Sequence, residues 1–341
     1  MIEGLEAAVA DRVIDRATAQ RLEPYLSNGA LVPDAVDPDD EKLRLVTGFN
    51  DIFVTIGLSM FLGALGYLGS SWGLGCAALA VAATSWGLAE YFTRKRRMAL
   101  PSIVLLVIFV GAVFLAVLGF MANGGSVFHA PDELTPERTL VAASAATLAA
   151  IAHWYRFHVP ITIAAGVAAL AAILLALCNM AAPGLLADHP VPIFLTLGLA
   201  IFALAMWFDS SDLKRQTRRT DIAFWLHLLA APIIVHPILL SVTGSDAPLG
   251  AALQVILVFV CLAVVALVVD RRAILVSSLS YLAYAAGKII TAAGMESSSF
   301  ATSTLAVGAI VLMLSAGWRP LRRSVMGLLP SSVRARLPAV A

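Results

Sequence analysis

Apolar residues fill most of this chain in long runs, and short polar segments separate the runs. A helix needs about 20 apolar residues to cross the hydrocarbon core of a bilayer, and the runs have this length. The sequence therefore predicts an all-α, polytopic membrane helix bundle with ten transmembrane helices. The predicted spans are residues 52–71, 73–92, 100–122, 137–155, 160–181, 190–208, 221–241, 248–269, 273–293 and 301–318.

Basic residues predict the orientation of these spans. With both termini in the cytoplasm, 21 of the 23 Lys and Arg residues fall in cytoplasmic segments, and the opposite loops are acidic or neutral. Arg138 and Lys288 are the two that fall elsewhere. Because cytoplasmic loops of membrane proteins are enriched in Lys and Arg, we expect an N-in/C-in, multi-pass protein of the bacterial inner membrane. Its first partner is then the lipid bilayer.

The two ends of the chain differ from the spans between them. Residues 1–26 carry two short amphipathic patterns, which predict a small cytosolic helical hairpin. Residues 27–40 form a Pro-, Gly- and Asp-containing linker, and the membrane domain covers residues 41–318. Residues 319–341 mix Arg with apolar residues, which is typical of a basic tail lying on the cytoplasmic membrane surface.

Composition excludes several classes of function. The chain is 60% hydrophobic and 13% charged, with a net charge of +1, so nothing favours nucleic-acid binding. No zinc-protease, serine-hydrolase, phosphate-loop or dinucleotide motif is present, and we expect neither an enzyme nor a cofactor. The three cysteines are far apart in sequence, and their spacing predicts no metal site.

The ninth span carries a polar stripe. Ser277, Tyr281, Tyr284 and Lys288 fall within an arc of roughly 60° on a helix. Unpaired polar groups in hydrocarbon are costly, so we expect this face to meet protein or a wet cavity inside the bundle. No Asp or Glu in the outer half of any span offers Lys288 a partner, which suggests an anionic solute as its partner. The alternative is a lysine that extends its amine to the interface.

The seventh span contains two histidines and two prolines. Pro232 should kink the helix, and kinked helices often border transporter cavities, so His236 is a further candidate for solute binding. The alternative for such a histidine is a hydrogen bond to a neighbouring helix. His227 lies about 180° from His236, so the two cannot share a metal or haem.

Two other features are interpreted as structural. Small residues in the first span, including Gly63 and Gly69, predict close helix packing. Asp209 and Asp270 lie at cytoplasmic helix ends beside Arg or Lys, where we expect ordinary interfacial ion pairs.

The order of the parts resembles a known family. The helical pair that ends in LEPYL is followed by a linker and then by LRLVTGFNDIFVTIG at the entry to the first span. This resembles the bacterial predicted membrane proteins with domain of unknown function 2157, over residues 1 to about 75. The resemblance implies a multi-span membrane protein and supplies no activity and no binding residue.

Three functions follow as hypotheses. The leading one is a transporter or binder of a small solute, for which an anionic group is the favoured feature, with Lys288, Tyr284, Tyr281, Ser277 and His236 as substrate-binding residues. The second is a non-transporting scaffold or sensor whose cytosolic hairpin meets a partner. The third is an intramembrane enzyme that acts on a lipid-linked substrate.

Overall fold

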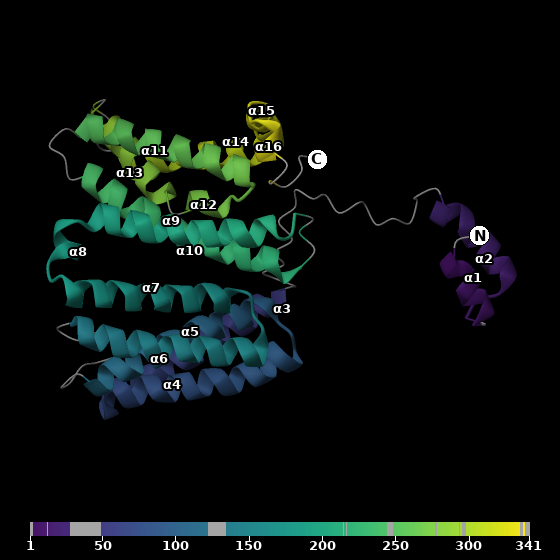
Figure 1. Ribbon diagram of the computed structural model, residues 1–341, viewed down its shortest axis with the longest axis horizontal. Coiled ribbons are helices and arrows are strands. Elements are labelled where there is room, and N and C mark those ends of the chain that lie inside the picture. Colours follow the sequence, from purple (N-terminus) through teal and green to yellow (C-terminus); the bar gives the residue numbers. More distant parts are fainter. Residues whose placement is uncertain are drawn as a thin grey trace. The chain divides into compact units, whose positions relative to one another are not determined.

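The computed structural model describes the chain in two units, residues 1–42 with 340–341 and residues 43–339, which are taken separately (Figure 1). The residues described are 3–11, 13–27, 49–121, 134–213, 215, 217–243, 248–276, 278–292, 294, 298–334 and 337. The predicted linker 27–40 lies outside them except for its first residue.

The first unit contains helices α1, Glu3–Ala10, and α2, Arg16–Ser27. Asp15 caps α2, because its carboxylate accepts a hydrogen bond from the backbone amide of Thr18 at 3.3 Å and another from the Thr18 hydroxyl. These hydrogen bonds, above all the one from the hydroxyl, lower the pKa of Asp15. Leu5 of α1 and Ala19 of α2 are buried, so even this pair has an apolar contact face.

All elements described in the second unit are helical. The long helices are α3 (Phe49–Gly69), α4 (Leu74–Ala89), α5 (Ala99–Met121), α6 (Pro136–Phe157), α7 (Ile161–Ala181), α9 (Pro190–Ser210), α10 (Arg218–Thr243), α11 (Pro248–Val269), α13 (Leu279–Ala292) and α14 (Ser299–Ala316). Short elements between and after them are η1 (Ser70–Trp72), η2 (Glu90–Lys95), α8 (Leu185–Asp188), α12 (Ala273–Val276), α15 (Trp318–Gly327) and α16 (Ser331–Arg334).

Seven helices in the described part of the chain are long and apolar enough to cross a membrane. Three of the ten predicted spans are absent from that set: 73–92, 137–155 and 273–293. Helix α4 has 16 residues before the π-helical turn η2 begins, and α6 begins with polar residues and has alanine at seven of its 22 positions. The predicted ninth span is divided into α12, of four residues, and α13, of 14 residues, on either side of residue 277. The structure thus supports a membrane-type helical bundle and leaves the count of ten as a prediction.

The long helices lie side by side with nearly aligned axes (Figure 1). Helix α5 packs against α3, α4 and α6, and α6 packs against α7. In the rest of the bundle α9 pairs with α10, and α13 packs against both α11 and α14. Contact between α7 and α10 joins the two groups, so α10 lies at the centre of the bundle's connectivity.

Buried apolar residues form several clusters, each of which lies among a different set of neighbouring helices. One cluster lies among α3, α4 and α5 around Leu62 and Leu105, and another lies among α7, α9 and α10 around Ile201 and Leu226. Many large apolar side chains on the opposite helix faces are exposed, including Phe61, Leu148 and Leu312. This arrangement, with apolar residues inside and outside, is the one that lipid as the surrounding solvent allows.

Close helix approach is found at one of the two glycines expected, Gly69, and at glycines outside the first span. A Cβ on Gly119 of α5 would lie 2.4 Å from the backbone nitrogen of Gly75 of α4, so these two backbones touch. Gly69 does lie against Ala77, at 3.1 Å from a Cβ position, but Gly63 faces open space, and a packing role for it is wrong. Spacing by threes and fours identifies a helix face and does not say what covers it.

Candidate functional site

Helix α10 carries both features that stand out chemically, one toward each of its ends. It has Pro232 and Pro237 in its interior. Proline has no backbone N–H, so the carbonyls one turn earlier lose their helical partners and the helix adapts locally. Toward its second half lies a pocket shared with α9, and toward its first half lies a buried cluster of ionised side chains.

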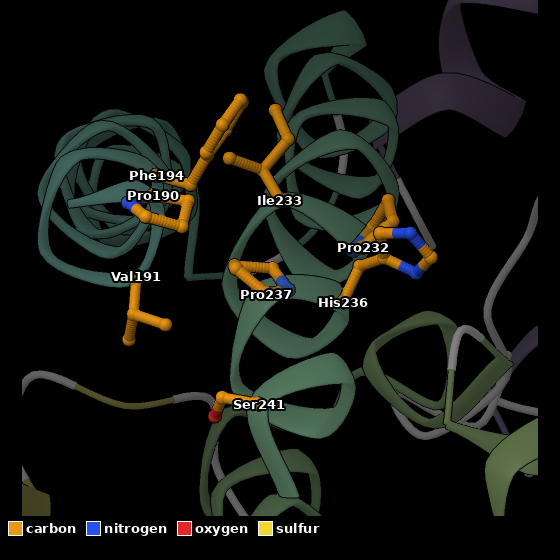
Figure 2. Close-up of a pocket in the computed structure, with 8 residues that line it drawn as sticks. All are labelled: Pro190, Val191, Phe194, Pro232, Ile233, His236, Pro237 and Ser241. Atoms are coloured by element: carbon orange, nitrogen blue, oxygen red, sulfur yellow. The ribbon is translucent and has the colours of Figure 1, made fainter. Parts of the chain in front are cut away.

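The α9–α10 pocket has a volume of about 550 Å³. It is lined by Pro190, Val191, Phe194, Pro232, Ile233, His236, Pro237 and Ser241. Figure 2 shows Val191 and Phe194 of α9 facing Ile233 and Pro237 of α10, so the wall between the helices is apolar. The imidazole of His236 and the hydroxyl of Ser241 are the polar side-chain groups of this lining. A pocket of this size with few polar groups is typical of small-molecule sites.

His236 connects the pocket to α13. Its Nδ1 forms a hydrogen bond with the hydroxyl of Tyr281, and the two ring centroids lie 5.8 Å apart. The seventh and ninth predicted spans therefore do meet through two of the proposed binding residues. This contact also matches the alternative interpretation of His236 as a histidine bonded to a neighbouring helix, and whether it binds a solute stays a prediction.

Lys288 and Tyr284 lie apart from that contact. Lys288 is exposed, four residues before the end of α13, and its Nζ lies 5.4 Å from the ring centroid of Tyr284. Tyr284 is itself 42% exposed. The ammonium is therefore not buried, and whether it faces a wet cavity of the bundle stays a prediction. Ser277 lies outside the described residues, and the substrate-binding roles of all three stay predictions.

At the other end of α10, His227 forms a hydrogen bond with a buried ion pair of Asp209 and Arg271. The carboxylate of Asp209, at the end of α9, lies 2.8 Å from His227 Nε2 and 3.3 Å from Arg271 Nε, both through Oδ2. Its second oxygen, Oδ1, accepts a hydrogen bond from a terminal nitrogen of Arg271. The same guanidinium donates to the backbone carbonyl of Thr220 at 3.2 Å. Asp209, His227 and Arg271 are all at least 96% buried.

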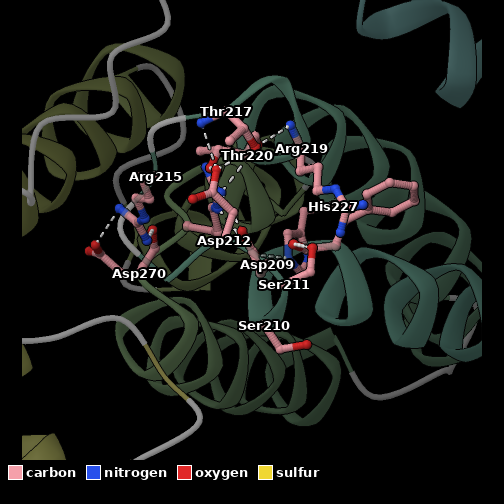
Figure 3. Close-up of polar contacts among 12 residues, drawn as sticks. Asp209, Ser210, Ser211, Asp212, Arg215, Thr217, Arg219, Thr220, His227 and Asp270 are labelled. Carbon is pink, nitrogen blue, oxygen red and sulfur yellow. Dashed lines mark hydrogen bonds and ion pairs between the residues drawn. The ribbon is translucent and has the colours of Figure 1, made fainter.

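A second ion pair lies beside the first and involves the residue before Arg271. Asp270 Oδ2 lies 2.7 Å from Arg215 on the α9–α10 loop (Figure 3). Asp270 Oδ1 accepts a hydrogen bond of 2.9 Å from the indole nitrogen of Trp318. Arg322 of α15 approaches the same carboxylate at 3.6 Å. We call these residues the ionic cluster: Asp209, Arg215, His227, Asp270, Arg271, Trp318 and Arg322.

The ionic cluster corrects an expectation and adds a site. Asp209 and Asp270 are buried, whereas the sequence suggested ordinary interfacial pairs. Their partners come from four separate stretches of the chain, so no local motif indicates the cluster. The available signal was an Asp at the end of an apolar run on each of two helices, next to arginine-rich segments, because a buried charge requires a partner.

A second pocket of about 510 Å³ lies on another face of α10. Its lining comes from α5, α6, α7 and α10 and is apolar, with many alanines and with Trp225 as its largest side chain. Pro232 lines both pockets. Trp225 is the one residue of this lining whose side chain can form a hydrogen bond, through its indole N–H, so the pocket offers little that would orient a polar ligand.

Comparisons with protein-family models, with curated proteins and with solved structures find no match for this chain. The fold therefore defines a class and no more: a helical bundle with several apolar helices, compatible with a membrane protein. In the described residues, no group of three or more His, Cys, Asp or Glu side chains is placed to hold a metal ion.

Proposed function

We propose that this protein is a ten-span, N-in/C-in protein of the bacterial inner membrane that binds and moves a small, largely apolar solute. The solute carries one hydrogen-bonding or anionic group, and it enters the α9–α10 pocket. The role is one of binding and transport and involves no covalent chemistry. The observation that carries the proposal is the pocket itself, in which apolar walls are combined with one imidazole and one hydroxyl.

The lining supports a specific orientation for the solute. Phe194, Ile233 and Pro237 give the apolar body a surface to pack on, and such burial contributes about 25 cal/mol per Å². His236 gives the polar end a hydrogen-bond partner or, when protonated, a cation. Exposed Lys288, on the helix that Tyr281 joins to His236, supplies positive charge that attracts an anionic group.

The contrast between the two ends of α10 supports transport over binding alone. His227 and His236 are separated by nine residues, or roughly 14 Å of helix rise. With the proposed topology the pocket lies in the extracytoplasmic half, and the ionic cluster ties the cytoplasmic ends of α9, α10 and α15 together. Access from outside with closure on the cytoplasmic side is one of the two states that alternating access requires.

Topology is tested separately from binding. We expect a reporter that is active only in the cytoplasm to work when fused after residue 96, and one that is active only outside to work after residue 245. The reverse activities would contradict N-in/C-in.

Binding is tested by thermal unfolding of the purified protein with benzoate and octanoate, and with benzamide and octanol as uncharged analogues. We expect at least one of these probes to raise the unfolding temperature of the wild type. Ile233→Trp, which fills the pocket, should remove this effect, and Leu199→Trp, on an exposed part of α9 outside the lining, should keep it. Uptake of the bound probe into liposomes then distinguishes transport from binding. An equal shift in both variants would contradict the pocket as the site.

A further inference from the structure

We propose that the Asp209–His227 pair is a proton-binding site, and that a proton arriving at His227 releases the ionic cluster at this end of the bundle. The inference rests on the proposed function, for which it names the coupling ion. It is carried by the geometry around one imidazole, whose two nitrogens have different surroundings.

The first nitrogen, Nε2, is occupied. At 2.8 Å from Asp209 Oδ2 it donates its hydrogen to the carboxylate, since that oxygen can only accept. The second nitrogen, Nδ1, is buried and has no hydrogen-bond partner in the described part of the structure. His227 as a whole has no exposed surface. A histidine held this way is neutral and presents a free lone pair, which is where a proton adds.

The surroundings of His227 determine what that proton does. Asp209 faces it from α9, and Arg271 from the turn before α12; Arg215 on the α9–α10 loop also acts on it electrostatically. Asp221, on the first turn of α10, interacts electrostatically with Arg271 and with Asp212 on the loop before α10. The side chains that α7 packs into this region are apolar: Ile163, Ala164 and Val167. The ring of Phe202 covers His227 at 5.2 Å between centroids.

Protonation of His227 therefore places a second positive charge next to Asp209 Oδ2, which already contacts the guanidinium of Arg271. Asp209 Oδ2 lies near both His227 Nε2 and Arg271 Nε, so the imidazolium and the guanidinium compete for it. Like charges in a buried site repel strongly, and the new N–H at Nδ1 has no acceptor. The weaker of the two contacts, at 3.3 Å to Arg271, is the one expected to lengthen, and Arg271 holds the turn that also contains Asp270.

The consequence for transport is a coupling between the proton and the cytoplasmic closure. Arg271 anchors the α11–α12 turn to α9, and Asp270 anchors the same turn to α15 through Trp318. When the contact of Arg271 with Asp209 weakens, the α9–α10 end is held to that turn chiefly by the remaining ion pair of Asp270 with Arg215 on the α9–α10 loop. A proton bound at His227 thereby favours the state in which the solute pocket opens to the cytoplasm.

The test follows backbone amide exchange of residues 269–275 in the purified full-length protein at about pH 8 and about pH 5, after correction for intrinsic exchange rates. In the wild type we expect the protection of this turn to fall about tenfold at the lower pH. His227→Gln keeps a neutral donor for Asp209 and cannot be protonated, so it should show no such change. A His227→Gln protein that retains the wild-type pH dependence would overturn the proposal.

His153→Gln is the matched control. His153 is also fully buried, but it contacts Thr162 at 3.2 Å and no carboxylate, so the turn should keep its pH dependence in this variant. Should His227→Gln fail to fold, exchange of the imidazole C2 hydrogen in the wild type reports the titration of His227 directly. A ring that stays neutral down to about pH 5 contradicts the proposal. None of these readouts needs a solute, so failure here leaves the pocket proposal standing, and failure of the pocket leaves the proton site standing.

Discussion

Asp270 and Arg271 are consecutive residues whose side chains form ion pairs with different parts of the chain. Asp270 contacts Arg215 on the α9–α10 loop, and Arg271 contacts Asp209 at the end of α9. Asp270 adopts a positive φ of 60°, and this left-handed turn lets neighbouring side chains diverge. A single turn thus connects α9, α10 and α15, and several predictions concern these contacts.

Asp209→Asn should strongly destabilise the protein. The substitution leaves the buried guanidinium of Arg271 without a counterion, and removing one partner of a buried ion pair costs about 3–5 kcal/mol. Chemical or thermal unfolding in detergent measures the loss. Glu90→Gln is the control, because its ion pair with Arg156 is solvent-exposed and its loss should lower the stability far less. Equal losses in the two variants would mean that the Asp209 pair is not enclosed.

Trp318→Phe should destabilise the attachment of α15. It removes the hydrogen bond from the indole to Asp270 and weakens the stacking of Arg272, whose guanidinium carbon lies 5.0 Å from the ring centroid. We expect a loss of about 1–3 kcal/mol and faster amide exchange in residues 318–327. Trp207→Phe, at an exposed tryptophan, should change neither quantity. Unaltered exchange in α15 after Trp318→Phe would contradict this anchoring role.

Gly119→Ala should separate α4 from α5. The new methyl group would lie 2.4 Å from a backbone nitrogen of Gly75, and backbone cannot rotate away as a side chain can. A loss of at least about 1–3 kcal/mol is expected from such overpacking. Gly87→Ala is the matched change on α4 with open space around the Cβ, and it should be neutral or stabilising by up to about 1 kcal/mol. Thermal unfolding of the two variants gives the comparison, and a stable Gly119→Ala protein would contradict the close approach.

Asp15 should make the first turn of α2 sensitive to acid. Its pKa is lowered chiefly by the hydrogen bond from the Thr18 hydroxyl, so the ionised form is the one that caps the helix. A carboxyl group whose folded pKa is depressed stabilises the fold above its unfolded pKa, and this contribution is lost as the pH falls through the folded pKa. Amide exchange of residues 16–19, corrected for intrinsic rates, should rise on acidification in the wild type. Asp15→Asn keeps a capping side chain that does not titrate, and it should remove most of this rise.

How far the sequence predicts the structure differs between helices. The long apolar runs that became α5, α7 and α11 were predicted within a few residues, because a helix of about 20 apolar residues is dictated by local composition. The ninth span was predicted as one helix, and the structure describes it as α12 and α13, with Ser278 in a turn just before α13. Mean hydropathy is averaged over many residues, so it does not detect such a break.

For the candidate sites, the sequence predicted even less of the arrangement than it did for the helices. The sequence identified His236 and Tyr281 as polar residues on apolar helices, and the structure brings those two together. It did not indicate that Lys288 would be exposed or that Asp209 would be buried with His227 and Arg271.

The sequence by itself determined that this protein is helical, that apolar helices of membrane-spanning length dominate it, and which residues on them are polar. Those properties follow from composition and from the 100° turn per residue, which are local. The tertiary structure alone decided which polar residues pair, because an ion pair between Asp209 and Arg271 joins positions 62 residues apart. No helical period connects such positions; only the packing of α9 and α10 against the α11–α12 turn brings their charges within contact distance.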